Sequence, residues 1–364
     1  MVDTNSNKIY SLAYSFVIFT SFLAVFIGEG THMMYEIGKN DTLISAIIGF
    51  ILSFIIFYIV RWIINKNDKE DVFELNKSIF GNVFGKVLNG ILWIGFFVVA
   101  TVIMYSMADF FNTEYLPDTS IDYLKFLVIL PAVYVSTKEF STLIKTNQIL
   151  SLISFGIIIL CFVGIWDAFE FKNFEPLFST SKSSIFKNII TYFIISSLPL
   201  SMFLITSKKN IKDDKNLNKN MLKIFILTNV TTIAIMCGTI LALGMEYISI
   251  FRFPEYIALK QFSLFDFLER VENILAMQYF FNNIGLLCLL YYFLIKLMPK
   301  TKLKKYYSIL IGVSQIIITS LLFNNTITFL EYLKKYLVYV IGICILLPII
   351  IIFFKMNKKS KWNA

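Results

Sequence analysis

A lone carboxylate lies between two glycines inside an apolar stretch. Gly28-Glu29-Gly30 interrupts a run that extends over about residues 9–38. An ionised side chain inside hydrocarbon costs about 2.5–3.5 kcal/mol on insertion scales, so such a residue is retained where it faces a cavity or a partner. Glycine weakens a helix, and non-helical backbone at membrane depth is tolerated only where it lines a protein interior or a water-filled site. The tripeptide therefore predicts a polar pocket inside a membrane protein.

The backbone of this interruption is expected to take part in binding. A half-helix that begins after Gly30 directs its N–H groups and its positive dipole end at the pocket, which suits a carboxylate such as that of an amino acid. The freed carbonyls can accept from an ammonium group. Glu29 has three candidate roles, which are pairing with a ligand ammonium, accepting a transported proton, and bonding to another span. His32 is the only histidine, and it either titrates beside Glu29 or caps the second half-helix.

A second interruption occurs in the apolar run near residues 186–206, where the sequence reads Ser196-Ser197-Leu198-Pro199-Leu200-Ser201. Proline removes a backbone donor and clashes with the preceding turn of a helix. Interruptions in corresponding spans of two halves indicate a transporter site near the bilayer midplane. The alternative is a simple proline kink. The two halves show no clear repeat in sequence.

Two further pairs of polar residues share a helix face through their i,i+4 spacing. Tyr105 and Asp109 lie on the third apolar span, and Gln278 and Asn282 lie on the eighth. Each pair either lines the pocket or only bonds to neighbouring helices, as polar residues in membrane bundles often do. Asp109 is a second candidate proton carrier.

The composition is that of a polytopic membrane protein embedded in a lipid bilayer. Hydrophobic residues make up 57% of the chain and charged residues 16%, whereas soluble domains have roughly 25% charged residues. The net charge of +9 does not indicate nucleic-acid binding, because the lysines lie between the apolar runs. With one histidine, no His/Cys metal spacing, no nucleophile elbow and no phosphate loop, we expect neither an enzyme nor a metal or cofactor site.

Ten apolar runs have about the length of a transmembrane helix. They cover about residues 9–38, 41–64, 87–111, 121–137, 142–166, 186–206, 222–246, 267–297, 304–324 and 335–355. We therefore predict an all-α fold in one transmembrane domain over residues 1–364. Its ten helices would form two inverted repeats of five, over about 9–166 and 186–355, with the first and sixth helices broken.

The basic residues predict the orientation. The termini and alternate connections carry 23 of the 33 lysines and arginines, and the opposite connections carry 9. The positive-inside rule places the first group, and with it both termini, in the cytoplasm. The longest outer connection covers about residues 247–266 and contains Phe253 and Tyr256. It either lies on the membrane surface or packs as an external loop.

Three stretches resemble the endospore germination permease family, the B-type integral-membrane subunits of spore germinant receptors. They are FIGEGTHMMYEIGKNDTLISAIIGFILSF at 26–54, SLPLSMFLITSKKNIKDDKNLNK at 197–219 and FPEYIALKQFSLFDFLERVENILAMQYFF at 253–281. That family belongs to the amino acid–polyamine–organocation superfamily. Many relatives have a small or apolar residue between the two glycines, and this chain has Glu29 there.

The resemblance implies a leucine-transporter-like fold in which Gly28–Thr31 and Ser196–Leu198 contact a small ligand. The third and eighth spans, with Tyr105, Gln278 and Asn282, would approach the same cavity. The implied protein is a germinant-receptor subunit of the inner spore membrane. It would bind a nutrient, most simply an amino acid, and pass the signal to A-type and C-type subunits. The alternative is a proton-coupled amino-acid symporter in which Glu29 or Asp109 carries the proton.

Overall fold

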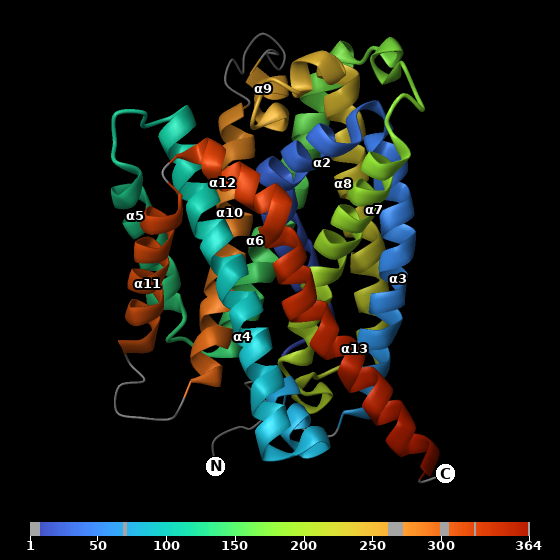
Figure 1. Cartoon of the computed structure of the whole chain (residues 1–364), viewed down its shortest axis with the longest axis vertical. Coiled ribbons are helices and arrows are strands. Elements are labelled where there is room, and N and C mark those ends of the chain that lie inside the picture. Colours follow the sequence, from blue (N-terminus) through green and yellow to red (C-terminus); the bar gives the residue numbers. More distant parts are fainter. Residues whose placement is uncertain (1–7, 68–70, 261–271, 299–305, 324, 363–364) are drawn as a thin grey trace.

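The structure, a computed structural model, describes residues 8–67, 71–260, 272–298, 306–323 and 325–362, with side chains described up to residue 358. Within these ranges the chain is helical, and the only β-type pairing is an isolated parallel bridge between Ile9 and Ile211. The predicted all-α fold is confirmed for this part of the chain. Figure 1 shows the helices as one bundle.

The α-helices are α1 (Ser11–Val25), α2 (Thr31–Gly38), α3 (Thr42–Lys66), α4 (Val72–Glu114), α5 (Ile121–Val135), α6 (Phe140–Ile165), α7 (Lys182–Ser197), α8 (Asp214–Ile248), α9 (Pro254–Lys260), α10 (Glu272–Leu297), α11 (Tyr307–Leu322), α12 (Thr326–Tyr332) and α13 (Val338–Trp362). The predicted spans at 267–297 and 304–324 extend outside the described residues.

Seven helical segments within the described ranges are long and apolar enough to cross a membrane, and α11 is a shorter apolar helix. The first segment, Ser11–Lys66, has 56 residues because it joins α1, α2 and α3 across two interruptions. Large apolar side chains are exposed on the outside of the bundle, including Ile51 and Ile55 on α3 and Leu310 and Leu321 on α11. Exposed apolar surface on this scale is what a lipid-facing protein needs. The chain is an integral membrane protein.

The backbone leaves the α-helical conformation between α1 and α2. Phe26–Gly30 form a π-type turn in which Ile27 has ψ 131° and Gly28 has φ 86°. Only glycine adopts a positive φ without steric cost, which explains why Gly28 stands at this point. The helix thus changes direction where the sequence predicted an interruption.

The chain also departs from α-helical geometry after α7. Leu198–Leu204 form a 3-10 segment that begins with Leu198-Pro199. Pro199 has no N–H group to continue the α-helical hydrogen bonds of α7. The chain then turns through Lys208–Asn210 and enters α8.

Helix α1 lies at the centre of the bundle. Nearly all of its residues are buried, and it contacts α6, α8 and α10. Helix α3 packs on α7, and α13 packs on α4. Helices α2, α9 and α12 gather at one end of the bundle, and the C-terminal end of α13 lies at the other end (Figure 1).

The connection after α8 packs against the protein over its described part. Phe253 and Tyr256 are both buried, and α9 contacts α8 and α10. Residues 249–260 therefore pack against the protein, which is the second of the two alternatives for residues 247–266. Residues 261–266 lie outside the described part of the chain.

Candidate functional site

The connection between α8 and α9 places an arginine at the break in the first helix. Arg252 Nη2 donates to Oε1 of Glu29, and Arg252 Nη1 forms an ion pair with Oδ2 of Asp109 on α4. The Glu29 and Asp109 side chains are 5% and 1% exposed, and that of Arg252 is 12% exposed. The free-energy cost of removing a charge from water is offset only when the charge is closely paired. The planar guanidinium group of an arginine can pair with two carboxylates at once.

Further contacts hold this ion-pair cluster in place. Thr326 Oγ1, at the start of α12, donates to Oδ1 of Asp109. On α2, Nδ1 of His32 lies 3.2 Å from the carbonyl oxygen of Phe251. A hydrogen bond there requires the tautomer that carries the proton on Nδ1. The break, α4, α12 and the α8–α9 connection therefore meet at one place.

Gly28 permits the close approach of this connection. A Cβ atom at Gly28 would lie 3.1 Å from Cδ1 of Phe253, tighter than ordinary van der Waals contact. The ring of Phe253 also packs edge-on against Phe110 of α4, with centroids 4.9 Å apart. The glycine thus serves both the positive φ and the packing of Phe253 over the break.

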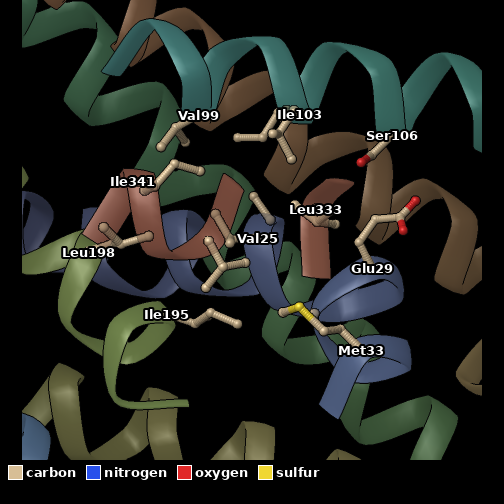
Figure 2. Close-up of a pocket in the computed structure, with 14 residues that line it drawn as sticks. Val25, Glu29, Met33, Val99, Ile103, Ser106, Ile195, Leu198, Leu333 and Ile341 are labelled. Carbon is tan, nitrogen blue, oxygen red and sulfur yellow. The ribbon is translucent and has the colours of Figure 1, made fainter. Parts of the chain in front are cut away.

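A cavity of about 40 Å³ lies beside the break. Its lining residues are mostly apolar and come from both interruptions and from α4 and α13: Ala24, Val25, Glu29, Gly30, Met33, Val99, Val102, Ile103, Ser106, Ile195, Leu198, Leu333, Val338 and Ile341. Figure 2 shows Glu29 and Ser106 at one end of the cavity and Leu198 and Ile341 at the other.

Two polar atoms at the Glu29 end have no protein partner. Oε2 of Glu29 and Oγ of Ser106 are both buried and have no hydrogen-bond partner among the described residues. Buried polar groups are hydrogen-bonded in the great majority of cases, so an unpartnered acceptor beside a cavity indicates a place for a ligand or water. The cavity therefore has a polar end that accepts hydrogen bonds and an apolar end.

Side-chain and backbone contacts join the helices at both ends of the bundle. On the side of α2, Lys334 Nζ forms an ion pair with Oε1 of Glu36. On the opposite side the start of α1 is tied to the α7–α8 connection, because Ser11 Oγ donates to Asp213 at 2.7 Å and Lys212 N donates to Ile9 O at 2.9 Å.

A second carboxyl lies behind the break, on α9. Glu255 is 5% exposed and has no ion-pair partner among the described residues. It lines a second space of about 30 Å³ together with Ile27, Thr239 and Leu275. Burial raises the pKa of this carboxyl to about 7, although the Thr31 side chain and the Gly28 backbone act to lower it.

Three of the ligand contacts expected from the sequence line the cavity, namely Glu29, Gly30 and Leu198. Gly28 lines a smaller space on the side of Phe253. Thr31 is buried, and its Oγ1 donates to the carbonyl oxygen of Gly28 at 2.9 Å. These residues of the first break lie together, as the sequence indicated.

The other expected contacts do not line this cavity. Ser196 donates to Oδ1 of Asn229 at 2.8 Å, and Ser197 is buried. Tyr105 packs against Phe329, with ring centroids 4.3 Å apart. The side chains of Ser196 and Tyr105 thus contact α8 and α12.

Gln278 and Asn282 point from α10 toward other parts of the bundle. Asn282 Oδ1 accepts from Ser154 Oγ of α6 at 3.0 Å. Gln278 is buried, and neither of its amide atoms has a partner among the described residues. The pair thus shares a face with α6 rather than lining the cavity beside Glu29.

Four residues of this region were not singled out by the sequence: Arg252, Ser106, Glu255 and Thr326. A signal was present for Arg252, because only three of the 33 basic residues are arginines. Arginine is always charged and binds carboxylates in two-armed geometry, so its use in a chain that otherwise uses lysine indicates a paired site. Ser106 precedes Asp109 by three residues and shares its helix face.

Metal ligation finds no support within the described ranges. They contain no group of three or more His, Cys, Asp or Glu side chains that could hold a metal ion. The four cysteines, Cys161, Cys237, Cys288 and Cys344, are all free.

A family model described as "Spore germination protein" matches residues 8–330 of this sequence. The chain belongs to the spore germination permease family. A search of curated proteins finds no match. Family membership indicates a membrane permease or receptor of spore germination rather than an enzyme.

The spore germination permease fold is similar to that of a solved Na⁺-coupled sialic acid symporter in its substrate-bound, outward-open state. The two chains are 12% identical, the match covers 93% of this chain and 79% of the symporter, and the TM-score is 0.61. At this identity the similarity establishes a transporter-type fold and nothing about the substrate.

Proposed function

We propose that this protein is the membrane subunit of a spore germinant receptor, and that it binds a small nutrient in the cavity beside Glu29. The nutrient carries an ammonium group, as an amino acid does, and its binding changes the balance between two conformations of the subunit. A ligand shifts such a balance only by its difference in affinity for the two conformations. The contacts that join the helices at both ends of the bundle are those that would differ.

The proposed architecture is that of ten transmembrane helices in a single domain. The first repeat, about 9–166, comprises α1 with α2, then α3, α4, α5 and α6. The second, about 186–355, comprises α7 with its 3-10 extension, then α8, α10, α11, and α12 with α13. The similarity to a symporter fold supports this assignment, as do the two interruptions at Phe26–Gly30 and Leu198–Leu204.

The proposed location is the inner membrane of the spore, with both termini on the cytoplasmic side and A-type and C-type subunits as partners. The asymmetry of 23 against 9 basic residues supports the orientation. Under this assignment α2, α9 and α12 lie on the outer side, so the Arg252 connection closes the cavity from the side on which a nutrient arrives.

The observation that carries the proposal is the unpartnered Oε2 of Glu29 at the polar end of an otherwise apolar cavity. An ammonium donates hydrogen bonds to this oxygen and to Ser106 Oγ, while the rest of the ligand contacts the apolar end. Ligand pockets are typically apolar with a few polar groups that fix orientation.

The proposal is tested by filling the cavity. Leu198→Trp places a large ring at the apolar end, whereas Ile51→Trp places the same ring on the exposed face of α3. Spores that carry Leu198→Trp should lose the nutrient response at nearly normal abundance of the subunit, and spores with Ile51→Trp should respond normally. A normal response with Leu198→Trp contradicts the proposal.

A second function is supported by the same carboxylate. Glu29 is buried with one free oxygen, so it can take up and release a proton, as a proton-coupled amino-acid symporter requires; Asp109, which is held by Arg252 and Thr326, is the second candidate carrier. Labelled amino acid should then accumulate in proteoliposomes that contain the isolated subunit and a proton gradient. Binding without accumulation favours the receptor.

A further inference from the structure

The charges at the break do not balance. Glu29 and Asp109 contribute two carboxylates, and Arg252 is the only cation that the described structure pairs with either of them. Lys125, which lies on α5 over the ring of Tyr105, pairs with Asp122 at 2.9 Å instead. The cluster therefore has one uncompensated negative charge.

The uncompensated charge faces the cavity. Arg252 occupies Oε1 of Glu29, whereas Oε2 is buried, lacks a partner among the described residues and belongs to a residue that lines the cavity. Ser106 Oγ, at the same end of the cavity (Figure 2), is also unpartnered. These atoms are independent of the ion pairs, and they mark the place where a donor group would be received.

Retaining Arg252 is more favourable than replacing it. If a cationic ligand displaced the guanidinium, the cluster would still have one excess negative charge, but if both cations are present the cluster is neutral. In a low-dielectric interior an unbalanced charge is costly. Arg252 thus acts as a fixed internal counter-ion, and the ligand supplies the missing positive charge.

We propose that the site selects a small ligand with a net charge of +1 and an apolar body, such as an aliphatic amine, over a zwitterion with the same body. A zwitterion brings its own carboxylate and leaves the cluster negative. This inference rests on the proposed function and defines the ligand class of the same cavity.

Three compounds with one apolar body test the charge rule. 3-Methylbutylamine is cationic, L-leucine is the zwitterion that adds a carboxylate, and 4-methylpentanoate is the anion without the ammonium. Each is added to the purified full-length protein at pH 7, and its affinity is taken from the concentration dependence of the thermal unfolding midpoint. The amine should bind at least about tenfold more tightly than leucine, and the acid should not bind.

Variants change the charge of the cluster one unit at a time. Glu29→Gln makes it neutral, so the preference for the amine over leucine should fall by about tenfold or more. Arg252→Gln makes it more negative, so the preference should not fall. If that variant does not fold, Arg252→Lys keeps the charge and should keep the preference. Glu246→Gln, which removes a carboxylate from the exposed end of α8, is the matched control and should leave it unchanged.

Equal binding of the amine and leucine, binding of the acid, binding of none of the three, or an unchanged preference in Glu29→Gln would each overturn the inference. Failure here is distinguishable from failure of the proposed function. If Leu198→Trp abolishes the spore response while the three compounds show no charge preference, the cavity is the nutrient site and only the charge rule is wrong.

Discussion

Arg252 donates to Glu29 across 223 positions of sequence, and this contact closes the α8–α9 connection onto the break in the first helix. The same guanidinium is ion-paired with Asp109 on α4. One side chain therefore holds together three segments that are distant in the chain. The charged groups at the polar end of the cavity come from these three segments.

Loss of Arg252 should destabilise the fold. Arg252→Gln leaves two buried carboxylates without their cation, and removing one partner of a buried pair costs about 3–5 kcal/mol. The midpoint of thermal unfolding of the purified protein should fall clearly. The double variant Arg252→Gln with Asp109→Asn removes one carboxylate as well and should recover much of the loss.

Lys260→Gln is the matched control, because Lys260 lies on the adjacent α9 and its contact with Glu114 is long, at 3.9 Å, and partly exposed. Exposed pairs contribute little. If Arg252→Gln were no less stable than Lys260→Gln, the cluster would not support the fold.

Gly28→Ala should disturb the closure of the cavity. Its φ of 86° strains any side-chain-bearing residue, and the new Cβ would press on the ring of Phe253. Such strain costs about 1–3 kcal/mol. We expect a lower unfolding midpoint and faster labelling of Ser106→Cys by a thiol reagent, in a background without the native cysteines. Gly90→Ala, where a Cβ meets open space within α4, should neither lower the unfolding midpoint nor speed the labelling, because alanine favours a helix over glycine.

The stability of the protein should depend on pH through Glu255. The unfolded carboxyl loses its proton near its ordinary pKa of 4.5, whereas the folded one retains it up to a pKa of about 7. Between these values the folded state binds more protons, so the free energy of unfolding falls as the pH rises from 4.5 to 7 and is level above. The Glu255→Gln variant has no carboxyl at this position, so its free energy of unfolding should not show this decrease with pH.

The difference in unfolding midpoint between Glu255→Gln and the parent should thus widen in favour of the variant from pH 4.5 to pH 7. Glu246→Gln, on the exposed end of α8, should follow the parent throughout. A constant difference between Glu255→Gln and the parent over this interval would show that the carboxyl has an ordinary pKa.

The orientation can be measured with single cysteines in a background without the native four. Glu175 lies in the connection between α6 and α7, and its carbonyl oxygen accepts from Asn40, which follows α2, at 3.0 Å. Lys212 lies in the connection between α7 and α8, where it contacts Ile9 just before α1. Both are exposed. In intact cells an impermeant thiol reagent should label Glu175→Cys and leave Lys212→Cys unlabelled. Labelling of position 212 alone would reverse the orientation.

The sequence predicted the all-α membrane fold and the polar break, because long apolar runs and a carboxylate between glycines each have a direct physical cost in lipid. It also placed Glu29, Gly30 and Leu198 at one cavity. It did not place Tyr105 or Ser196, because i,i+4 spacing defines a shared helix face but not what that face contacts. The scarcity of arginine indicated a paired site at Arg252, but its partners Glu29 and Asp109 could not be predicted. Nothing local to a connection tells whether it turns toward solvent or into the bundle.

The most direct test of the account is the nutrient dose–response of spores that carry Glu29→Gln, measured beside spores with Glu246→Gln, a change on the exposed end of α8. Gln keeps the size of the side chain and can still accept from Arg252, but it removes the negative charge that the ligand ammonium would meet. The account predicts that Glu29→Gln spores need at least about tenfold more nutrient for half-maximal germination, as loss of a buried charged contact implies, at normal abundance of the subunit. Spores with Glu246→Gln should respond like the parent. An unchanged dose–response with Glu29→Gln would contradict the assignment of the cavity as the ligand site.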